Sequence, residues 1–546
     1  MSLPGAFTEA MIQHNCEALR RAQGSCPPVA ALQPGTARAV PDAALGIRLE
    51  LRTRDDRWVP LDGADPMAAA ASRVAPLLDQ PQIILVGLGL GYALDRLEAL
   101  GSQAKVLVFE PDPAVATLCL ARRDWRSWIE SGRLRLLVGP DYAGATSMAR
   151  WVDVATPPAF SVSETLAAQR PKSTQGARTV AERVVGDAES NLDARRRFAG
   201  RYLLQTLANL PVMLRESNAA QLDGLFAGVP AVVVGAGPSL DENVRALAQW
   251  QDRAVIIAAD TTLRPLLAGG VRPHIVVGVD PAELNARHVA GVNGVDDSWL
   301  VGEGSLHPAA FVGFAGRTFT FKVSRHEPWP WLEAHGAGRG TLRAWGSVIT
   351  SAFDLALRLG CSPIAFAGLD LAYTGERPYC SHTLYDTTWR DVLMACNNWT
   401  FEELVADYFA NRTTSWEPDL HGTPVRTAPP LLSFRNWLLD QMAQPSAVRF
   451  VNATGGGLLY GPGVEQGSLD DVLGGAPVRD DLRSRLREAH AAGRTTHAVS
   501  ATGLETLAAG DTPDEAALLA RWRAFTLETV ETTDIVAALH AAASRL

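Results

Sequence analysis

A glycine-rich turn between an apolar run and a helical pattern has the residue types best suited to a chemical role. Ala231–Val234 is apolar throughout, and Gly235-Ala236-Gly237-Pro238-Ser239 follows directly. Glycine lacks a Cβ, so a ligand can approach such a turn closely. The helix predicted from Asp241 offers unpaired N–H groups and the positive end of its dipole, which bind phosphate. Leu240 replaces the third glycine of the dinucleotide fingerprint and no Gly-Lys-Ser/Thr follows, so an ordinary strand-to-helix connection fits the turn as well.

Three carboxylates fall where other strands are predicted to end. Asp260, Asp280 and Asp370 follow strands expected at 254–258, 275–279 and 364–367. In open α/β sheets, ligands bind beyond the carboxyl ends of the strands. Each carboxylate alone is explained as a helix cap or a turn residue. Together, beside a glycine turn, they predict a polar site.

The segment 370–388 is rich in groups that move protons or stack on rings. It holds Tyr373, Tyr379 and Tyr385, three of the eight tyrosines, together with His382. Histidine titrates near neutrality, which suits a general base that takes a proton from a hydroxyl. A solvated surface loop explains the same residues equally well. His421 is a second candidate for the base.

A second glycine turn lies nearer the N-terminus, at Gly87–Gly91. Glu110 follows at about the distance expected of an acid that binds ribose, which favours a dinucleotide or methyltransferase interpretation. Leu85 and Val86 stand where many S-adenosylmethionine enzymes have an acidic residue, and no catalytic motif follows. We therefore expect a scaffold here, and whether this turn binds a ligand stays open.

Composition limits the classes of function. A chain of 546 residues needs more than one core. The net charge of -9 argues against broad nucleic-acid or anionic-membrane binding. The cysteines show no paired or zinc-binding spacing, which suits a reducing cytosol: Cys16, Cys26, Cys119, Cys361, Cys380 and Cys396. With no signal peptide evident and the most apolar run, 83–94, too short to span a bilayer, we expect a cytoplasmic protein without membrane insertion.

The pattern of elements predicts an α/β protein with two Rossmann-like domains. The first, 1–180, contains a hairpin at 46–61 that turns at Arg54-Asp55-Asp56, and then a βαβ unit at 83–110. A helical lead-in, 188–214, opens the second domain, 181–470. Its strands are expected at 231–234, 254–258, 275–279, 299–302, 318–323 and 364–367, with helices at 241–250, 261–267 and 348–359. Ser347 is the expected N-cap of the last helix, and 471–546 is a helical C-terminal region.

The motifs of the second domain, taken together, resemble a known family. The run from Val234 to Asp241 is similar to the signature of the motility-associated factor (Maf) flagellin glycosyltransferases, which share the domain-of-unknown-function 115 core. Further matches keep the family's order, at 256–260, 270–274, 277–281, 346–348, 360–374 and 452–457. The likeness spans about 200–470, and the first domain also looks like the family's N-terminal part. The family is distantly similar to bacterial sialyltransferases that use CMP-activated sugars, so the resemblance implies a sialyltransferase-like central domain.

The resemblance also implies roles for individual residues. Those at the nucleotide or donor are Gly235, Gly237, Pro238, Ser239, Asp260, Asp280 and Ser347, and those facing the donor sugar are Asp370 and Tyr373. His382 is our candidate for the base. Two positions depart from the family. Leu369 stands where Maf proteins often have Gln, and Gly455 replaces an acid, so neither role carries over.

The activity implied is transfer of a nonulosonic acid, of pseudaminic or legionaminic type, from its CMP form to Ser or Thr of flagellin, in support of flagellum assembly and motility. Flagellin and the CMP-sugar are then the partners, with no nucleic acid. No resident cofactor or metal-ligand set is assigned, and metal dependence stays open. Two alternatives remain: a hydroxymethylpterin pyrophosphokinase-like enzyme, which shares the core, and a non-enzymatic flagellin-binding assembly factor.

Overall fold

The structure, a computed structural model, describes residues 8–33, 35–42, 46–53, 55–142, 144–323, 325–395, 400–410, 412–494 and 499–546. The chain divides into two compact units, Met1–Asp193 and Ala194–Leu546. The long helix α7 (Pro171–Ala208) belongs to both, since it begins in the first and ends in the second. The division 1–180, 181–470 and 471–546 stays a prediction. Within the described residues, no helix is both long and apolar enough to cross a membrane.

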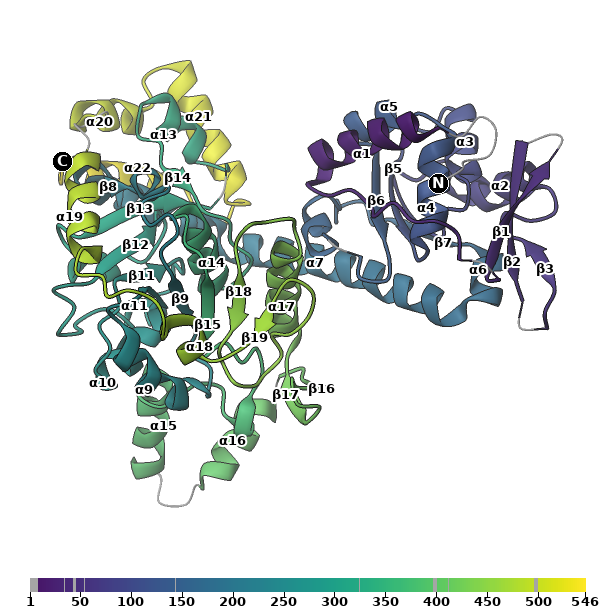
Figure 1. Ribbon diagram of the computed structural model, residues 1–546. Coiled ribbons are helices and arrows are strands. Elements are labelled where there is room, and N and C mark those ends of the chain that lie inside the picture. Colours follow the sequence, from purple (N-terminus) through teal and green to yellow (C-terminus); the bar gives the residue numbers. More distant parts are fainter. Residues whose placement is uncertain are drawn as a thin grey trace. The chain divides into compact units, whose positions relative to one another are not determined.

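The first unit is built on a four-stranded parallel sheet in the order β6-β5-β4-β7 (Figure 1). Its strands are β4 (Gln82–Val86), β5 (Lys105–Glu110), β6 (Leu134–Val138) and β7 (Ala159–Val162). Its helices are α1 (Glu9–Gln23), α2 (Pro66–Val74), α3 (Tyr92–Ala99), α4 (Pro113–Arg122), α5 (Arg126–Glu130) and α6 (Glu164–Gln169). The predicted βαβ unit is therefore confirmed as β4-α3-β5.

The expected hairpin is part of a separate antiparallel sheet. It pairs β1 (Ala37–Asp42) with β2 (Gly46–Arg52), and β2 with β3 (Trp58–Pro60). Arg54 of the predicted turn lies outside the described residues.

The cysteine pattern suggested no pairing, but Cys16 and Cys26 form a disulfide; Cys396 lies outside the described residues.

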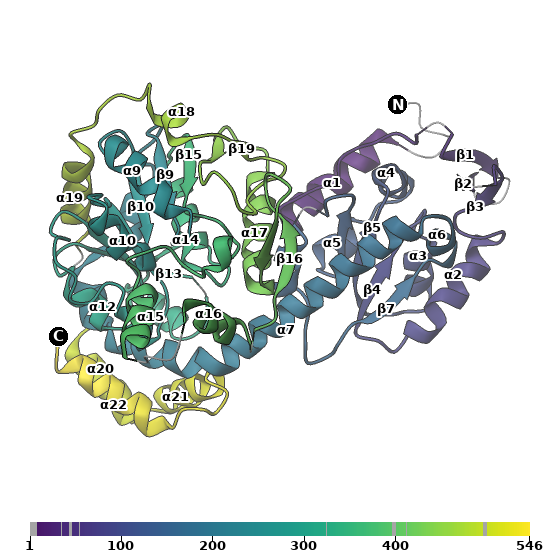
Figure 2. The same cartoon turned by 90° about the horizontal axis from the view of Figure 1, so that it is seen from below.

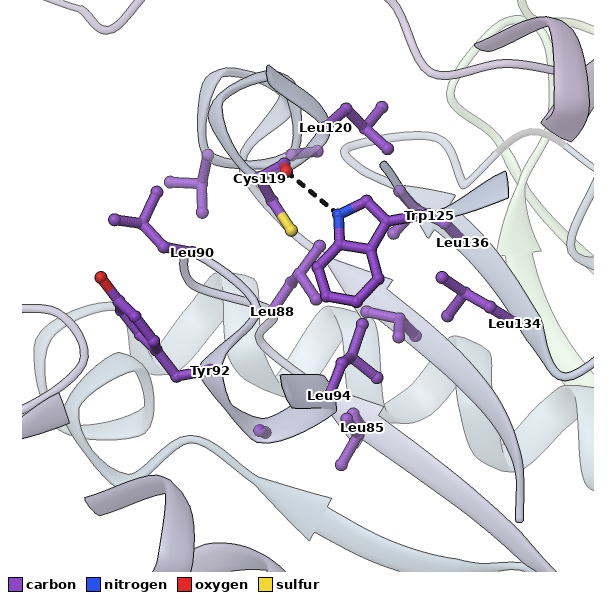
Figure 3. Close-up of a cluster of buried hydrophobic side chains, with 14 of the residues drawn as sticks. Leu85, Leu88, Leu90, Tyr92, Leu94, Cys119, Leu120, Trp125, Leu134 and Leu136 are labelled. Atoms are coloured by element: carbon purple, nitrogen blue, oxygen red, sulfur yellow. Dashed lines mark hydrogen bonds between the residues drawn. The ribbon is translucent and has the colours of Figure 1, made fainter. Parts of the chain in front are cut away.

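The core of the first unit gathers around buried Trp125 (Figure 3). Its indole Nε1 donates to the Cys119 carbonyl at 3.1 Å, which satisfies the one polar atom of the ring. Leu85, Leu94 and Leu136 from the sheet and α3 surround it. Burial of this apolar surface stabilises the layer of helices against the sheet.

The second unit is built on a ten-stranded sheet in which nine strands follow the order β14-β13-β12-β11-β10-β9-β15-β18-β19 and the tenth, β8, pairs with β13. Every pairing in it is parallel. The strands are β8 (Ser217–Asn218), β9 (Ala231–Val234), β10 (Val255–Ala259), β11 (Ile275–Gly278), β12 (Trp299–Glu303), β13 (Thr318–Lys322), β14 (Gly340–Thr341), β15 (Ile364–Ala367), β18 (Phe450–Asn452) and β19 (Glu465–Gln466). The six strands predicted between 231 and 367 lie within one residue of these bounds, and the α/β fold class is confirmed.

Helices cover both faces of this sheet. Successive side chains of a strand point to opposite faces, and the strands are apolar on both, so both faces must be covered. Val232 and Val234 point into one cluster with Leu240 and Leu247 of α9 (Leu240–Trp250). On the other face, Phe366 packs on Phe353 of α14 (Val348–Arg358), with ring centroids 5.8 Å apart. The predicted helix at 261–267 is a 3₁₀ turn at Asp260–Thr262 followed by α10 (Leu263–Ala268).

The remaining helices and the small hairpin of the second unit complete it (Figures 1 and 2). They are α8 (Leu210–Arg215), α11 (Glu283–Ala286), α12 (Ala309–Val312), α13 (Trp329–Ala334), α15 (Leu384–Ala395), α16 (Phe401–Ala410), β16 (Ser415–Pro418), β17 (Pro424–Thr427), α17 (Pro429–Met442), α18 (Leu469–Leu473), α19 (Leu482–Gly493), α20 (Ala501–Ala509), α21 (Pro513–Phe525) and α22 (Thr532–Ala543). The last three share an apolar core with Leu203 of α7 and Trp329 of α13.

Candidate functional site

The glycine turn after β9 crosses the end of the neighbouring strand β15. The amide of Gly235 donates to the Ala367 carbonyl at 2.9 Å, and that of Gly237 to the Gly368 carbonyl at 2.8 Å. A Cβ at Gly237 would overlap the Asp370 carboxylate, and one at Gly235 would lie 2.7 Å from the Gly368 oxygen. From the sequence alone, these glycines are expected to let a ligand approach closely. In the structure, the chain that approaches them closely is the end of β15.

Asp370 places its carboxylate at the start of α9. It accepts hydrogen bonds from the hydroxyls of Ser239 (2.6 Å) and Thr374 (2.7 Å), and from the Ser239 amide (3.3 Å). The side chain is 1% exposed, and burial raises the pKa of its carboxyl group. The positive end of α9 therefore already faces a carboxyl group of the protein itself. Pro238 lies in the same turn, and its carbonyl accepts from the Asp241 amide at 3.3 Å.

The loop that follows Asp370 is fixed from the same helix. Asp241, in the first turn of α9, accepts from the Ser381 amide at 2.9 Å and pairs with Arg377 at 2.8 Å. The Cys380 amide donates to the Ala236 carbonyl at 3.0 Å. The glycine turn and α9 thus hold the segment that carries the predicted histidine and tyrosines.

The two departures from the family also lie here. Leu369 is buried, and its amide donates to the Thr454 hydroxyl at 3.2 Å. Gly455 has a φ of 84° and no atom within 4 Å of where a Cβ would stand. Glycine therefore suits this position because of its positive φ, and not because a side chain would meet neighbouring atoms.

Asp260 and Asp280 lie together at the carboxyl ends of β10 and β11. Asp260 accepts from the Thr261 amide at 2.7 Å, and Asp280 from the Ala282 amide at 2.7 Å. Burial raises the pKa of Asp260 to about 7, and the charge of Asp280 adds to the rise. Neighbouring parallel strands end at the same edge, so the structure brings these two carboxylates together; that they share a binding site stays a prediction.

Sequence reasoning missed Glu303, which ends the next strand, β12. Glu303 is buried, accepts from the Ser305 amide at 2.6 Å, and has its pKa raised to about 7, chiefly by burial. Tyr202 of α7 lies within the electrostatic reach of both acids. Burial raises its pKa to about 12, and this value includes smaller contributions from the charges of Glu303 and Asp280. The strand prediction ended at Gly302, one residue short; extending it would have found this acid.

The tyrosines after β15 form two groups. Tyr379 and Tyr385 stack with ring centroids 4.5 Å apart, and Asp280 and Asp260 lie near enough to Tyr385 for their charges to raise its pKa, after burial and Tyr408. Tyr373 instead packs edge-on against Phe409 of α16 at 4.8 Å. The structure therefore brings Tyr385 to the Asp260–Asp280 pair, while Tyr373 lies in an aromatic cluster beside Asp370.

The two candidate bases, His382 and His421, are both exposed but differ in their hydrogen bonds. His382 is exposed and has a φ of 66°. Its backbone amide donates a hydrogen bond to the Asp386 carboxylate at 2.9 Å. His421 is also exposed, but its Nε2 lies 3.0 Å from the Gly455 carbonyl and must act as the donor there. Only one ring nitrogen of neutral His421 is then left to accept a proton.

Ser347 caps α14 as predicted. Its hydroxyl oxygen accepts from the Ile349 amide at 3.4 Å, which leaves its proton available for another acceptor. For metals, the described residues contain no group of three or more His, Cys, Asp or Glu side chains arranged to hold an ion.

The glycine turn of the first unit is occupied by the protein's own side chains. Glu110 accepts from the Leu88 amide at 2.6 Å, and Asp62 from the Leu90 amide at 3.3 Å. Arg73 donates to the Gly87 carbonyl at 2.8 Å. Burial raises the pKa of Glu110 to about 7 and that of Asp62 to about 6. These contacts use amides that a nucleotide would need, in keeping with the expected scaffold role.

Replacing Gly237 by Ala tests the crossing of the turn with β15. The new Cβ overlaps the Asp370 carboxylate, so we expect a loss of about 1–3 kcal/mol in unfolding free energy. Gly456→Ala is the matched control, because open space surrounds that position. Urea unfolding of the three proteins measures the difference, and equal midpoints would contradict the packing described.

Asp260 should make stability depend on pH. Its folded pKa of about 7 lies above its ordinary 3.8, so the folded state holds the proton longer and stability falls as pH rises between these values. Asp260→Asn cannot ionise and should gain stability relative to the parent across that window, by at most about 4 kcal/mol. Urea midpoints at pH 5 and pH 8 measure this, with exposed Asp296→Asn as control. A difference from the parent that does not change with pH would refute it.

Comparison with known proteins places a family core within the second unit. Residues 204–376 match the family model described as "6-hydroxymethylpterin diphosphokinase MptE-like". A solved structure of a Maf glycosyltransferase from Magnetospirillum magneticum AMB-1 is similar at 16% sequence identity and a TM-score of 0.48, over 97% of this chain and 90% of that one. No curated protein matches the chain. The resemblance that the motifs indicate is thus confirmed at the level of the core, since residues 204–376 are similar to the MptE-like family model.

Proposed function

We propose that this chain is a glycosyltransferase that moves a nonulosonic acid, of pseudaminic or legionaminic type, from its CMP form to Ser or Thr of flagellin. The support is the ordered set of motifs from Val234 to Gly457, together with the arrangement of polar groups at one edge of the second sheet. The reaction would take place in the cytoplasm, before flagellin is assembled.

The observation that carries the proposal is the row of acids at the carboxyl ends of the strands. Asp260, Glu303 and Asp370 are buried there, and Asp280 is half-buried. Such an edge suits a ligand rich in hydroxyl and N–H donors and opposes a chain of phosphates. A nucleotide sugar with a single phosphate fits this edge better than a nucleoside triphosphate does.

In this reaction, the acceptor oxygen forms a bond to the anomeric carbon while the bond from that carbon to the phosphate oxygen breaks. The hydroxyl proton passes to a base, and CMP leaves with its added negative charge. His382 is our proposed base, and the Ser347 hydroxyl, with the N–H groups that begin α14, would stabilise the leaving phosphate.

The second candidate is a diphosphokinase acting on a hydroxymethylpterin, favoured by the description of the family that residues 204–376 match. It would transfer a diphosphate from ATP and would need Mg²⁺. Titration calorimetry with CMP and with Mg–ATP separates the two, since the glycosyltransferase binds CMP and the kinase binds Mg–ATP.

Transfer itself is tested by the intact mass of flagellin co-expressed with this protein and a pathway that makes a CMP-nonulosonic acid. We expect mass increments of one sugar residue per modified site. Flagellin of unchanged mass, with the CMP-sugar present in the cells, would refute the proposed activity.

His382→Ala should abolish the mass increments while leaving the affinity for CMP within about twofold, because the base acts on the acceptor. His421→Ala is the matched control, since that exposed ring is anchored on the Gly455 carbonyl. Glycosylation retained in His382→Ala and lost in His421→Ala would reverse the assignment of the base.

A further inference from the structure

His288 is a buried polar side chain without a hydrogen-bond partner. It follows α11, eight residues after Asp280, and is 1% exposed. Among the described residues, neither of its ring nitrogens has a partner. Buried polar atoms are nearly always hydrogen-bonded, because water has been removed from them at a cost in free energy. A ring with both nitrogens unsatisfied therefore calls for an explanation.

Tyr385 connects this ring to the candidate site. The two rings lie with centroids 5.5 Å apart, and Tyr385 also lies within the electrostatic reach of Asp260 and Asp280. On the same tyrosine, a small pocket is lined by Tyr379, Thr383 and Trp389. Tyr385 therefore contacts the His288 ring and also lines that pocket.

The imidazole is in its neutral form. Burial, with a smaller contribution from the charge of Arg264, lowers its pKa to about 4. A neutral imidazole has one N–H donor and one acceptor nitrogen. Its best partners are therefore groups that both donate and accept, such as sugar hydroxyls or the amino-pyrimidine edge of cytosine.

We propose that His288 is a ligand-recognition residue of the site at the carboxyl ends of β10 and β11, where its ring hydrogen-bonds the nucleoside part of the bound nucleotide sugar. The proposal rests on the proposed function, because it takes the ligand to be a CMP-sugar. The two nitrogens remain unsatisfied in the free protein and are satisfied when the nucleotide replaces the Tyr385 ring.

His288→Phe separates recognition from a purely structural role. The phenyl ring keeps the shape and removes both polar atoms, so the thermal midpoint should stay equal or rise. The affinity for CMP, measured by calorimetry, should fall about tenfold, the equivalent of one lost hydrogen bond to a ligand. His288→Gln restores a donor and an acceptor and should recover most of the affinity.

His274→Phe is the matched control. His274 is also buried and neutral, but it precedes β11 and accepts from the Ile256 amide at 3.1 Å. Its loss should lower the thermal midpoint and leave CMP affinity unchanged, the opposite of the result expected at His288.

A ring ¹⁵N signal gives a readout that structural damage does not mimic. In protein labelled at histidine, CMP should shift the ring signals that disappear in His288→Gln. Equal CMP affinity in His288→Phe and the parent would overturn the proposal while leaving the proposed function intact. A parent protein that binds no CMP would instead refute the proposed function, and the role of His288 with it.

Discussion

The second unit depends on one close contact, the crossing of the β9–α9 turn with the end of β15. Gly235 and Gly237 donate to consecutive carbonyls of the segment that runs through Gly368, and no side chain fits between the two. Gly368 itself has a φ of 63°, a conformation that glycine adopts without strain. This crossing sets the position of Asp370 at the start of α9. Through Asp241, it also fixes the loop that leads to His382 and Tyr385.

The parallel sheet explains why so many acids share one edge. Each strand of a parallel sheet ends on the same side, so a residue just after a strand meets those just after its neighbours. Asp260, Asp280 and Glu303 follow or end three adjacent strands. Burial raises the pKa of Asp260 and of Glu303, and the charge of Asp280 adds to the rise at Asp260, so these two acids keep their protons to a higher pH than exposed carboxyl groups do.

Much of the fold was predictable because the strands are short, apolar and bounded by glycine, proline or aspartate. The alternation of such runs with helical patterns identifies a parallel α/β sheet. Ser347 is the N-cap of α14, as its residue type predicts. The site was less predictable, because proximity between strand ends depends on strand order. Nothing in the local sequence indicates that β15 lies beside β9, and hence that Asp370 would bind Ser239. His288 was missed for a similar reason: it falls in no motif, and only burial without partners marks it.

The two glycine turns show that a shared sequence pattern does not determine what a turn binds. Both turns follow a buried strand and lead into a helix. In both, a carboxylate of the protein accepts a hydrogen bond from a backbone amide of the turn. In the first unit, Glu110 and Asp62 hold the turn's amides and Arg73 one of its carbonyls, so the polar groups of the turn are satisfied from within. In the second, Asp370 has hydroxyl partners, and the neighbouring strands add Asp260, Asp280 and the unpartnered ring of His288. Buried polar groups that lack a partner favour a binding site, and by that criterion the second turn is the stronger candidate of the two.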